Sequence, residues 1–142
     1  MVRSTVKGRL SKHDFERLLE FRDGLRRFLH WSEERARQAG LTGPQHQLLL
    51  AVRGHGSPPS VSDVAAHLLL RHHSAVELVD RACEAGLVRR VADRHDQRVV
   101  RVELTDDGER RLHSLARAHL EELSRIRPRF DALWKHLPGD GV

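Results

Sequence analysis

The chain of 142 residues has little cysteine, few aromatic residues and no long apolar run, and each shortage excludes a class of protein. Cys83 is the only cysteine, which excludes an internal disulfide and suits a reducing compartment. Aromatic residues make up 4% and tyrosine is absent, which counts against an RNA-recognition sheet or a single-strand binder, since both need stacking platforms. No apolar run approaches bilayer length, and the opening MVRSTVKGRL lacks the apolar segment of a signal peptide. We therefore expect one soluble, cytoplasmic domain that makes no membrane contact.

Positive charge is present in excess, but almost all of it is arginine. The formal net charge is +5 and the pI about 10.5, although the chain has only three lysines. Arginine suits planar recognition of phosphates and guanine edges better than lysine does. A G·C-rich genome would also raise the arginine content, so the composition permits a nucleic-acid partner without selecting one.

Three short signals mark helix starts in the first half of the chain. Each joins a Ser or Thr with an Asp or Gln three residues later, the spacing of a capping box. The pairs are Ser11 with Asp14, Thr42 with Gln45, and Ser60 with Asp63. We expect a long first helix that stops at Gly40, a second through about Arg53, and a brief third one. A fourth helix is predicted in RHHSAVELVDRACEAG, because apolar residues recur there at helical spacing and Gly86 suits the position after a helix end.

The stretch DRHDQRVVRVELT, residues 93–105, predicts a hairpin with a charged loop. Val100, Val102 and Leu104 alternate with charged residues at the two-residue period of a half-buried strand. Residues 87–92 form another β-prone run, so two strands would flank an arginine-bearing loop. Two short helices joined by a tight turn and followed by this hairpin make a helix-turn-helix with a wing.

A last helix is predicted after the hairpin. Thr105 can cap it, and Asp106 and Asp107 place negative charge in its first turn, where the helix dipole favours negative charge. Pro128 should end or kink it. The small central module cannot cover the apolar stripes of both the first and the last helix, so we expect a two-fold homodimer.

The predicted fold is mainly α with a small β-hairpin wing, which places it in the α+β class. Residues 1–40 and 106–142 would form a helical dimerisation region, and residues 41–105 a winged helix-turn-helix module. Both parts would belong to one intertwined domain.

The hairpin segment also contains the most specific motif of the chain. DRHDQRVVRVELTDDG resembles the wing pattern of the MarR (multiple-antibiotic-resistance regulator) family of bacterial winged helix-turn-helix transcription factors: Asp, two residues, Asp, any residue, Arg, then a strand ending in Leu-Thr-x-x-Gly. The positions of the pattern are filled by Asp93, Asp96, Arg98, Leu104, Thr105 and Gly108. LVDRACEAGLVRR resembles the end of the family's recognition helix with the first wing strand, and LTGPQHQLLLAV the opening of its second helix. The similarity covers about residues 11–137.

The resemblance implies a homodimeric repressor that binds a palindromic operator on double-stranded DNA. In the family the recognition helix reads the major groove and the wing arginine enters the minor groove. The residues that would contact DNA are Ser60, Ser62, Arg71, His72, His73, Ser74, Glu77, Arg94 and Arg98, with Asp93 and Asp96 supporting the wing. The chain departs from the family where residues 70–73 read LRHH in place of the usual Ser, Asp or Asn cap, so we expect weak capping of the recognition helix.

The family often binds small anionic or aromatic molecules in a cleft between the dimer helices and the winged module. The residues that could line such a cleft by position are Phe28, His30, Trp31, Arg35 and His46. No cofactor is expected. Asp80 and Arg81 should form an internal pair, and Cys83 should behave as a small buried hydrophobe.

Three other classes of function compete with a DNA-binding regulator. Eleven histidines raise the idea of a zinc- or ligand-sensing module, but HExxH, Cys-x-x-Cys and histidine pairs four residues apart are all missing, so no metal site is predicted. An enzyme is not expected, because no Gly-rich phosphate loop, nucleophile elbow or pair of catalytic carboxylates occurs. A sequence-independent nucleoid protein stays open, and it would bind specific and scrambled duplexes equally well.

Overall fold

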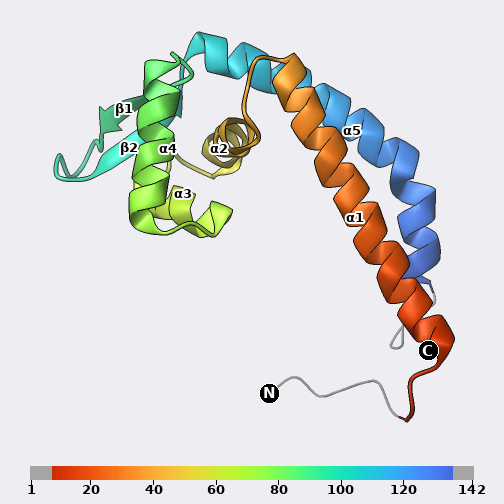
Figure 1. Ribbon diagram of the computed structural model, residues 1–142. Coiled ribbons are helices and arrows are strands. Elements are labelled where there is room, and N and C mark those ends of the chain that lie inside the picture. The colour runs from red at the N-terminus through yellow and green to blue at the C-terminus, as the bar shows by residue number, and fades with distance from the viewer. Residues whose placement is uncertain (1–7, 136–142) are drawn as a thin grey trace. The chain divides into compact units, whose positions relative to one another are not determined.

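The computed structural model describes residues 8–135 and is mostly helical, with one two-stranded antiparallel hairpin (Figure 1). The elements are, in chain order, α1 (Lys12–Gln38), α2 (Gly43–Gly54), α3 (Val61–Leu68), α4 (His72–Glu84), β1 (Val88–Ala92), β2 (Val100–Leu104) and α5 (Asp106–Trp134). The predicted fold class is therefore confirmed. Two compact units can be distinguished: the winged unit, Glu33–Arg117, and the helical unit, which joins α1 up to Ser32 with α5 from Ala118.

The capping signals read from the sequence are confirmed at all three helix starts. Thr42 and Ser60 each form a complete capping box with the residue three positions on. Ser11 does the same for α1, since its N–H donates to the Asp14 carboxylate at 2.7 Å and its hydroxyl accepts from the Asp14 N–H at 3.3 Å. By contrast, α4 begins after Arg71 without any side-chain cap, as its sequence predicted.

The two strands pair in a register that runs from Val88 opposite Leu104 to Ala92 opposite Val100. This register turns Val88 and Val102 into the core. The N–H of Val102 also donates to the Pro59 carbonyl at 2.8 Å, which ties the hairpin to the segment just before α3.

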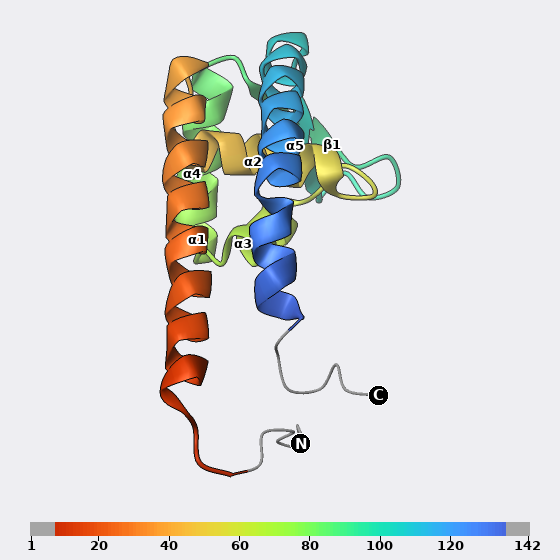
Figure 2. The same ribbon diagram turned by 90° about the vertical axis from the view of Figure 1, so that its right-hand side faces the viewer.

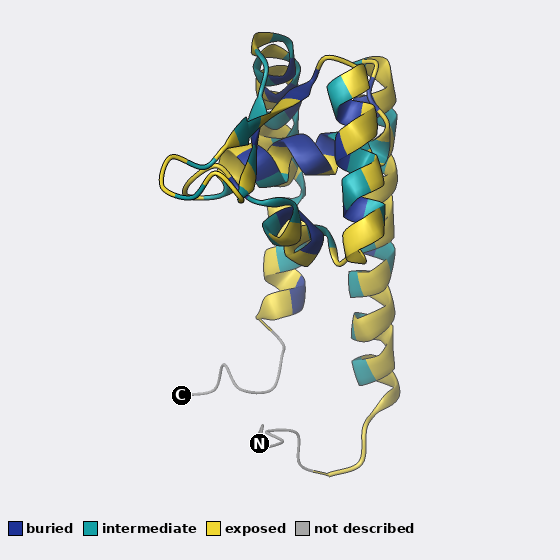
Figure 3. Ribbon diagram, turned by 90° about the vertical axis from the view of Figure 1, so that its left-hand side faces the viewer, coloured by how far each residue is buried: buried dark blue, intermediate teal, exposed yellow. Residues whose placement is uncertain are grey.

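The core of the winged unit lies between α2, α3, α4 and the hairpin. In Figure 3, α2 is dark blue along much of its length, and Leu48 and Leu49 on it are fully buried. The main buried residues that join them are Val64, Val79, Ala82, Leu87, Val102, Leu112 and Leu115. The short helices thus turn their apolar stripes inward and leave their polar faces in solvent.

The helical unit is held by aromatic contacts between α1 and α5, which run alongside each other in this unit (Figures 1 and 2). Phe21 meets Phe130 and Trp134 edge-on, with ring centroids 6.1 and 5.5 Å apart. At Gly24, an added Cβ would lie 3.1 Å from the Phe130 ring, so the absence of a side chain there lets the two helices approach closely.

The end of α5 differs from the prediction. Pro128 lies inside the helix, which continues to Trp134, so of the two predicted effects, an end or a kink at Pro128, the end is wrong. A proline costs a helix one backbone hydrogen bond, and here the aromatic contacts of Phe130 and Trp134 with α1 favour continuation. None of the helices within residues 8–135 combines the length and the apolar character needed to cross a membrane.

Candidate nucleic-acid interface

The outer face of α4 presents the residues predicted to read bases. Ala75, Val79 and Ala82 are buried on its inner face. On the other side, the polar residues at and after the helix start are Arg71, His72, His73 and Glu77, all exposed, and Ser74, half-buried. Because no side chain caps the start of α4, its first-turn N–H groups are open to an external acceptor such as phosphate.

The start of α3 offers two serines in different states. Ser60 is half-buried, and its hydroxyl accepts from the Asp63 N–H at 3.1 Å, while its own N–H donates to the Asp63 carboxylate at 3.0 Å. This N–H lowers the pKa of Asp63 below its ordinary value. Ser62 is exposed and lies in the first turn of α3. The Ser60 hydroxyl thus caps α3, whereas the exposed Ser62 hydroxyl is more accessible to a phosphate.

Asp93 organises the loop of the wing. One of its carboxylate oxygens accepts from the N–H groups of His95 and Asp96 at 3.0 and 2.9 Å, and the other accepts from Arg101 Nε at 3.1 Å. The two backbone N–H groups, the His95 one first, lower the pKa of Asp93. A loop without a tight two-residue turn is therefore held by one carboxylate.

Arg98 stands at the tip of this loop with its side chain 92% exposed. Asp96 holds it: one carboxylate oxygen lies 3.1 Å from Arg98 Nε and the other 3.3 Å from a terminal guanidinium nitrogen. The hydrogen bonds from the Arg98 side chain, and then from its N–H, lower the pKa of Asp96. Arg94, on the other side of the tip, is exposed and makes no ion pair with any residue from 8 to 135.

Arg101 was not singled out from the sequence, yet it joins the wing to α3. Its guanidinium lies 3.1 Å from the carboxylate of Asp93 and 3.7 Å from that of Asp63. Its backbone also forms an isolated bridge with Ser60. A strand position that alternates with apolar neighbours predicts only an outward-facing side chain, so the sequence held no signal for this contact.

Of the five residues predicted to line a ligand cleft, Phe28 and Trp31 come together in the helical unit. Their rings stack with centroids 6.1 Å apart, and the Trp31 ring meets the His119 ring at 4.8 Å. His119 Nε2 also lies 2.7 Å from the Ser32 hydroxyl. His30 is exposed on α1.

The other two predicted cleft residues belong to the winged unit. Arg35 is exposed near the end of α1 and donates to Gln38 at 3.3 Å. His46 is buried on α2.

Beside Phe28 and Trp31 lies a small cavity of about 160 Å³ that the sequence did not reveal. Phe130 adds a third aromatic wall, and Arg27 and Arg129 reach it from α1 and α5. Arg125 reaches it too, but is engaged by Glu122, which raises the pKa of this arginine. Helical spacing could have shown that these arginines share a face with the aromatic residues, but not that the two faces meet.

Two structural predictions, for Asp80 and for Cys83, are wrong in part. Asp80 pairs with Arg90 on β1 rather than with Arg81, because the hairpin returns past α4. Cys83 is half-buried rather than buried, and Arg90 approaches its sulfur at 3.7 Å. Within residues 8–135, no three His, Cys, Asp or Glu side chains gather closely enough to hold a metal ion.

Comparisons with known proteins agree with this geometry. A model of the MarR family matches residues 39–99, which run from just after α1 into the loop of the wing. No curated protein is similar enough to the chain to count as a relative.

Among solved structures, the transcriptional regulator PA4135 shares 28% identity over 86% of this chain and 85% of its own, with a TM-score of 0.64. AbsC, a MarR family transcriptional regulator from Streptomyces coelicolor, shares 22% over 84% and 81%, with a TM-score of 0.70. A MepR mutant of S. aureus bound to an oligodeoxyribonucleotide shares 17% over 92% and 88%, with a TM-score of 0.60. The match of residues 39–99 to the MarR family model and the fold shared with these proteins confirm the predicted resemblance to the MarR family, of which AbsC is a transcriptional regulator.

Proposed function

We propose that this chain is a homodimeric, sequence-specific regulator that binds a palindromic operator on double-stranded DNA and acts in the cytoplasm as a ligand-responsive repressor. The observation that carries the proposal is the wing tip, where Asp96 holds an almost fully exposed Arg98 in one orientation. An arginine presented in this way fits the narrow minor groove, where negative potential is concentrated. The solved MepR mutant with its bound oligodeoxyribonucleotide shows that a protein of this fold can engage DNA.

In the winged unit, α4 and the wing would contact different grooves of the DNA. The first turn of α4, with Arg71, His72 and His73 exposed, would enter the major groove, and Glu77 one turn later could accept from cytosine. Ser62 and the uncapped start of α4 would contact phosphates, which fix the register without reading sequence. Specificity would then come from α4 and from groove width at the wing.

Substitution of Arg98, the arginine at the wing tip, tests the proposed DNA binding. Arg98→Ala should weaken binding to the selected operator by about tenfold to a hundredfold, the loss expected for one arginine in a groove. The melting temperature should stay unchanged, because an exposed ion pair contributes little to stability. Arg26→Ala, which removes an equally charged exposed arginine from the helical unit, is the matched control and should leave affinity nearly unchanged. Fluorescence anisotropy at fixed salt measures both.

Two outcomes of this assay would contradict the proposal. Equal affinities of Arg98→Ala and the wild type would remove the wing from recognition. Equal affinities of the wild type for the operator and a scrambled duplex at matched salt would point to a sequence-independent nucleoid protein instead.

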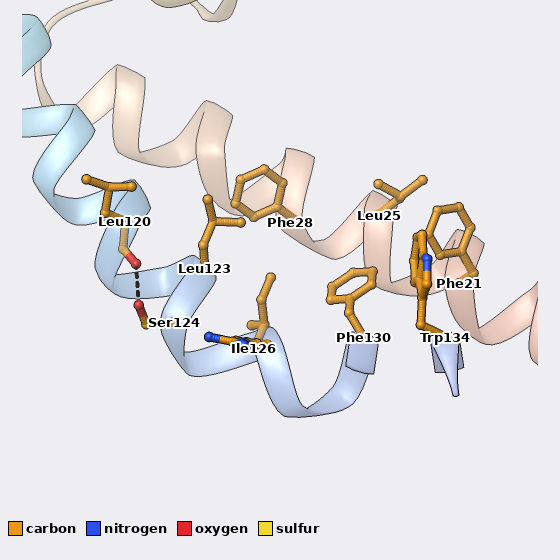
Figure 4. A pocket seen from close by; sticks show the side chains of 10 residues that line it. Phe21, Leu25, Phe28, Leu120, Leu123, Ser124, Ile126, Phe130 and Trp134 are labelled. Carbon is orange, nitrogen blue, oxygen red and sulfur yellow. Dashed lines mark hydrogen bonds between the residues drawn. The ribbon is translucent and has the colours of Figure 1, made fainter. Parts of the chain in front are cut away.

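A second copy of the chain is the proposed occupant of the apolar surface on the helical unit. Large apolar side chains are exposed there on both helices: Phe15, Leu18, Leu19, Leu29, Leu120, Leu123 and Trp134. Figure 4 shows Leu120, Leu123 and Trp134 beside Phe21 and Phe28 around an apolar groove of about 620 Å³. A monomer rarely exposes so many large apolar side chains on one pair of helices, and a two-fold dimer would also explain a palindromic operator.

Sedimentation velocity tests the dimer. Leu123→Glu should shift the chain towards monomer and weaken operator binding, because a charge would be buried in the interface. Leu50→Glu, at an exposed leucine of α2, should leave the dimer intact. A wild-type chain that sediments as a monomer at micromolar concentration would refute the proposed assembly.

The small cavity beside Trp31 is the proposed ligand site. Its aromatic walls and two arginines without an ion-pair partner among residues 8–135, Arg27 and Arg129, suit a small planar anion. Benzoate is the probe and neutral benzamide its control: calorimetry should detect benzoate alone, and benzoate should release the operator. Equal binding of the two, or none by benzoate, would contradict this assignment.

A further inference from the structure

Leu69, in the turn between α3 and α4, combines two unfavourable features. It has φ 54° and ψ 41°, and is the only non-glycine residue with positive φ among residues 8–135. Its side chain is also 92% exposed, the largest exposure among the large apolar side chains of the described chain. A leucine in the left-handed region is strained by its Cβ, and an exposed one gains nothing from burial.

The backbone of the turn explains the conformation but not the choice of residue. The N–H of Leu69 and the N–H of Leu70 both point back to the Ala65 carbonyl, the latter at 2.9 Å. This is the hydrogen-bonding pattern that closes a helix through one left-handed residue. Glycine is the usual residue at such a position because it has no Cβ.

Glycine occupies the left-handed position in the two other turns of this kind within residues 8–135. Gly40 after α1 and Gly86 after α4 have φ +77° and +73°. In both, the following leucine, Leu41 or Leu87, donates a 2.9 Å backbone hydrogen bond to the carbonyl five residues back and is buried. Only at Leu69 does a large side chain occupy the left-handed position, so it serves neither the turn nor the core.

The place of Leu69 indicates what its side chain meets. It lies two residues before Arg71, the N-cap of α4, and its exposed neighbours in sequence are Leu70 and then Arg71, His72 and His73. If this end of α4 faces the major groove, as in the function proposed above, Leu69 lies at the same groove. The prominent apolar group on the edge of a base pair there is the 5-methyl of thymine.

We propose that Leu69 is a specificity-determining residue that packs against a thymine methyl group in each half of the operator. The inference rests on the proposed DNA-binding function and adds a reading element to it. Strained residues cluster at binding sites, and a contact with the thymine methyl group would account for a strained leucine at this position. The basic residues around it make an apolar protein partner or the interior of a lipid bilayer a poorer fit.

The experiment uses the full-length chain and a duplex selected by that chain from random sequences. Each thymine of the selected duplex is replaced in turn by deoxyuridine, which removes the methyl group and nothing else. At one symmetric pair of positions, wild-type affinity should fall about fourfold for each half-site, the loss expected for one buried methyl group. Leu69→Gly should bind the thymine and deoxyuridine duplexes equally, at the level of the wild type on deoxyuridine.

Leu69→Asn separates the side chain from the backbone, because asparagine tolerates the left-handed region yet lacks the branched apolar end. It too should lose the discrimination, while both variants keep or raise the melting temperature because strain is relieved. If Leu69→Gly keeps the wild-type discrimination, or if no thymine position matters to the wild type, the inference is overturned while sequence-specific binding itself stands. If the wild type selects no sequence at all, the proposed function fails and this inference with it.

Discussion

Gly108, in the first turn of α5, is the position where adding one methyl group should harm the fold most clearly. A Cβ built there would lie 2.1 Å from the Leu87 carbonyl oxygen and 3.1 Å from its carbonyl carbon. The same carbonyl accepts the Thr105 N–H at 3.0 Å, and the Gly108 N–H donates to the Thr105 hydroxyl at 3.1 Å. The close approach of α5 to the start of β1 therefore leaves no space for a side chain.

The expected magnitude follows from two opposing effects. Replacing glycine by alanine inside a helix normally stabilises it by up to about 1 kcal/mol. A 2.1 Å contact with a backbone oxygen cannot be relieved by a rotamer change, so the strand and the helix must separate; overpacking of this kind costs about 1–3 kcal/mol, and we expect the upper end. The net loss is then about 2 kcal/mol, which lowers the melting temperature by about 8 °C in a chain of this size.

Thermal unfolding followed by circular dichroism compares Gly108→Ala with Gly54→Ala. Gly54 ends α2, and a Cβ there would meet nothing within 4 Å, so this control should be neutral or slightly stabilising. If the two variants melt within 2 °C of each other, the close approach of α5 to β1 is not as the structure has it.

Two further predictions concern the winged unit. Leu49→Ala should lower the free energy of unfolding by about 2–5 kcal/mol because Leu49 is fully buried, whereas Leu50→Ala, at its exposed neighbour, should cost less than about 1 kcal/mol; urea unfolding checks both, and similar losses would contradict the core. Asp63→Ala should cost about 1 kcal/mol at neutral pH through loss of the capping box. Because the Ser60 N–H lowers the folded pKa of Asp63 below 3.8, this stabilisation is fully present above that value and is lost as the pH falls through the folded pKa; a deficit in unfolding free energy that stayed constant down to about pH 3 would contradict the assignment.

Most of the winged module could be predicted from the sequence, because its signals are local. A capping box depends on residues three positions apart, and a strand shows its two-residue period over five residues. Thr105 is a further example: its position before two aspartates predicted a cap, and its hydroxyl accepts the N–H of Gly108. The motif around Asp93 and Arg98 is local as well, and it carries the resemblance to the MarR family.

The features that could not be predicted from the sequence depend on contacts between distant segments. The sequence predicts a pair between Asp80 and its neighbour Arg81, but the hairpin brings Arg90 to Asp80, and the spacing of these residues does not indicate that contact. The proline rule predicts an end or a kink at Pro128, and it takes no account of the aromatic residues beyond Pro128 that pack on α1. The left-handed backbone of Leu69 was equally hidden, because leucine is the last residue a turn rule would place there.

The root of the wing limits how a ligand could control DNA binding. The Arg101 guanidinium lies against both Asp93 in the wing and Asp63 at the start of α3, and the Val102 N–H donates to the Pro59 carbonyl just before that helix. Moving the wing away from the helix-turn-helix would break these contacts together and expose Val102, which is fully buried. A ligand bound by the helical unit of the proposed dimer would have an easier route to control, because the two recognition helices of such a dimer must reach successive major grooves about 34 Å apart. In the proposed dimer, a small change in the spacing between the two copies would then weaken operator binding, while each winged unit stays intact.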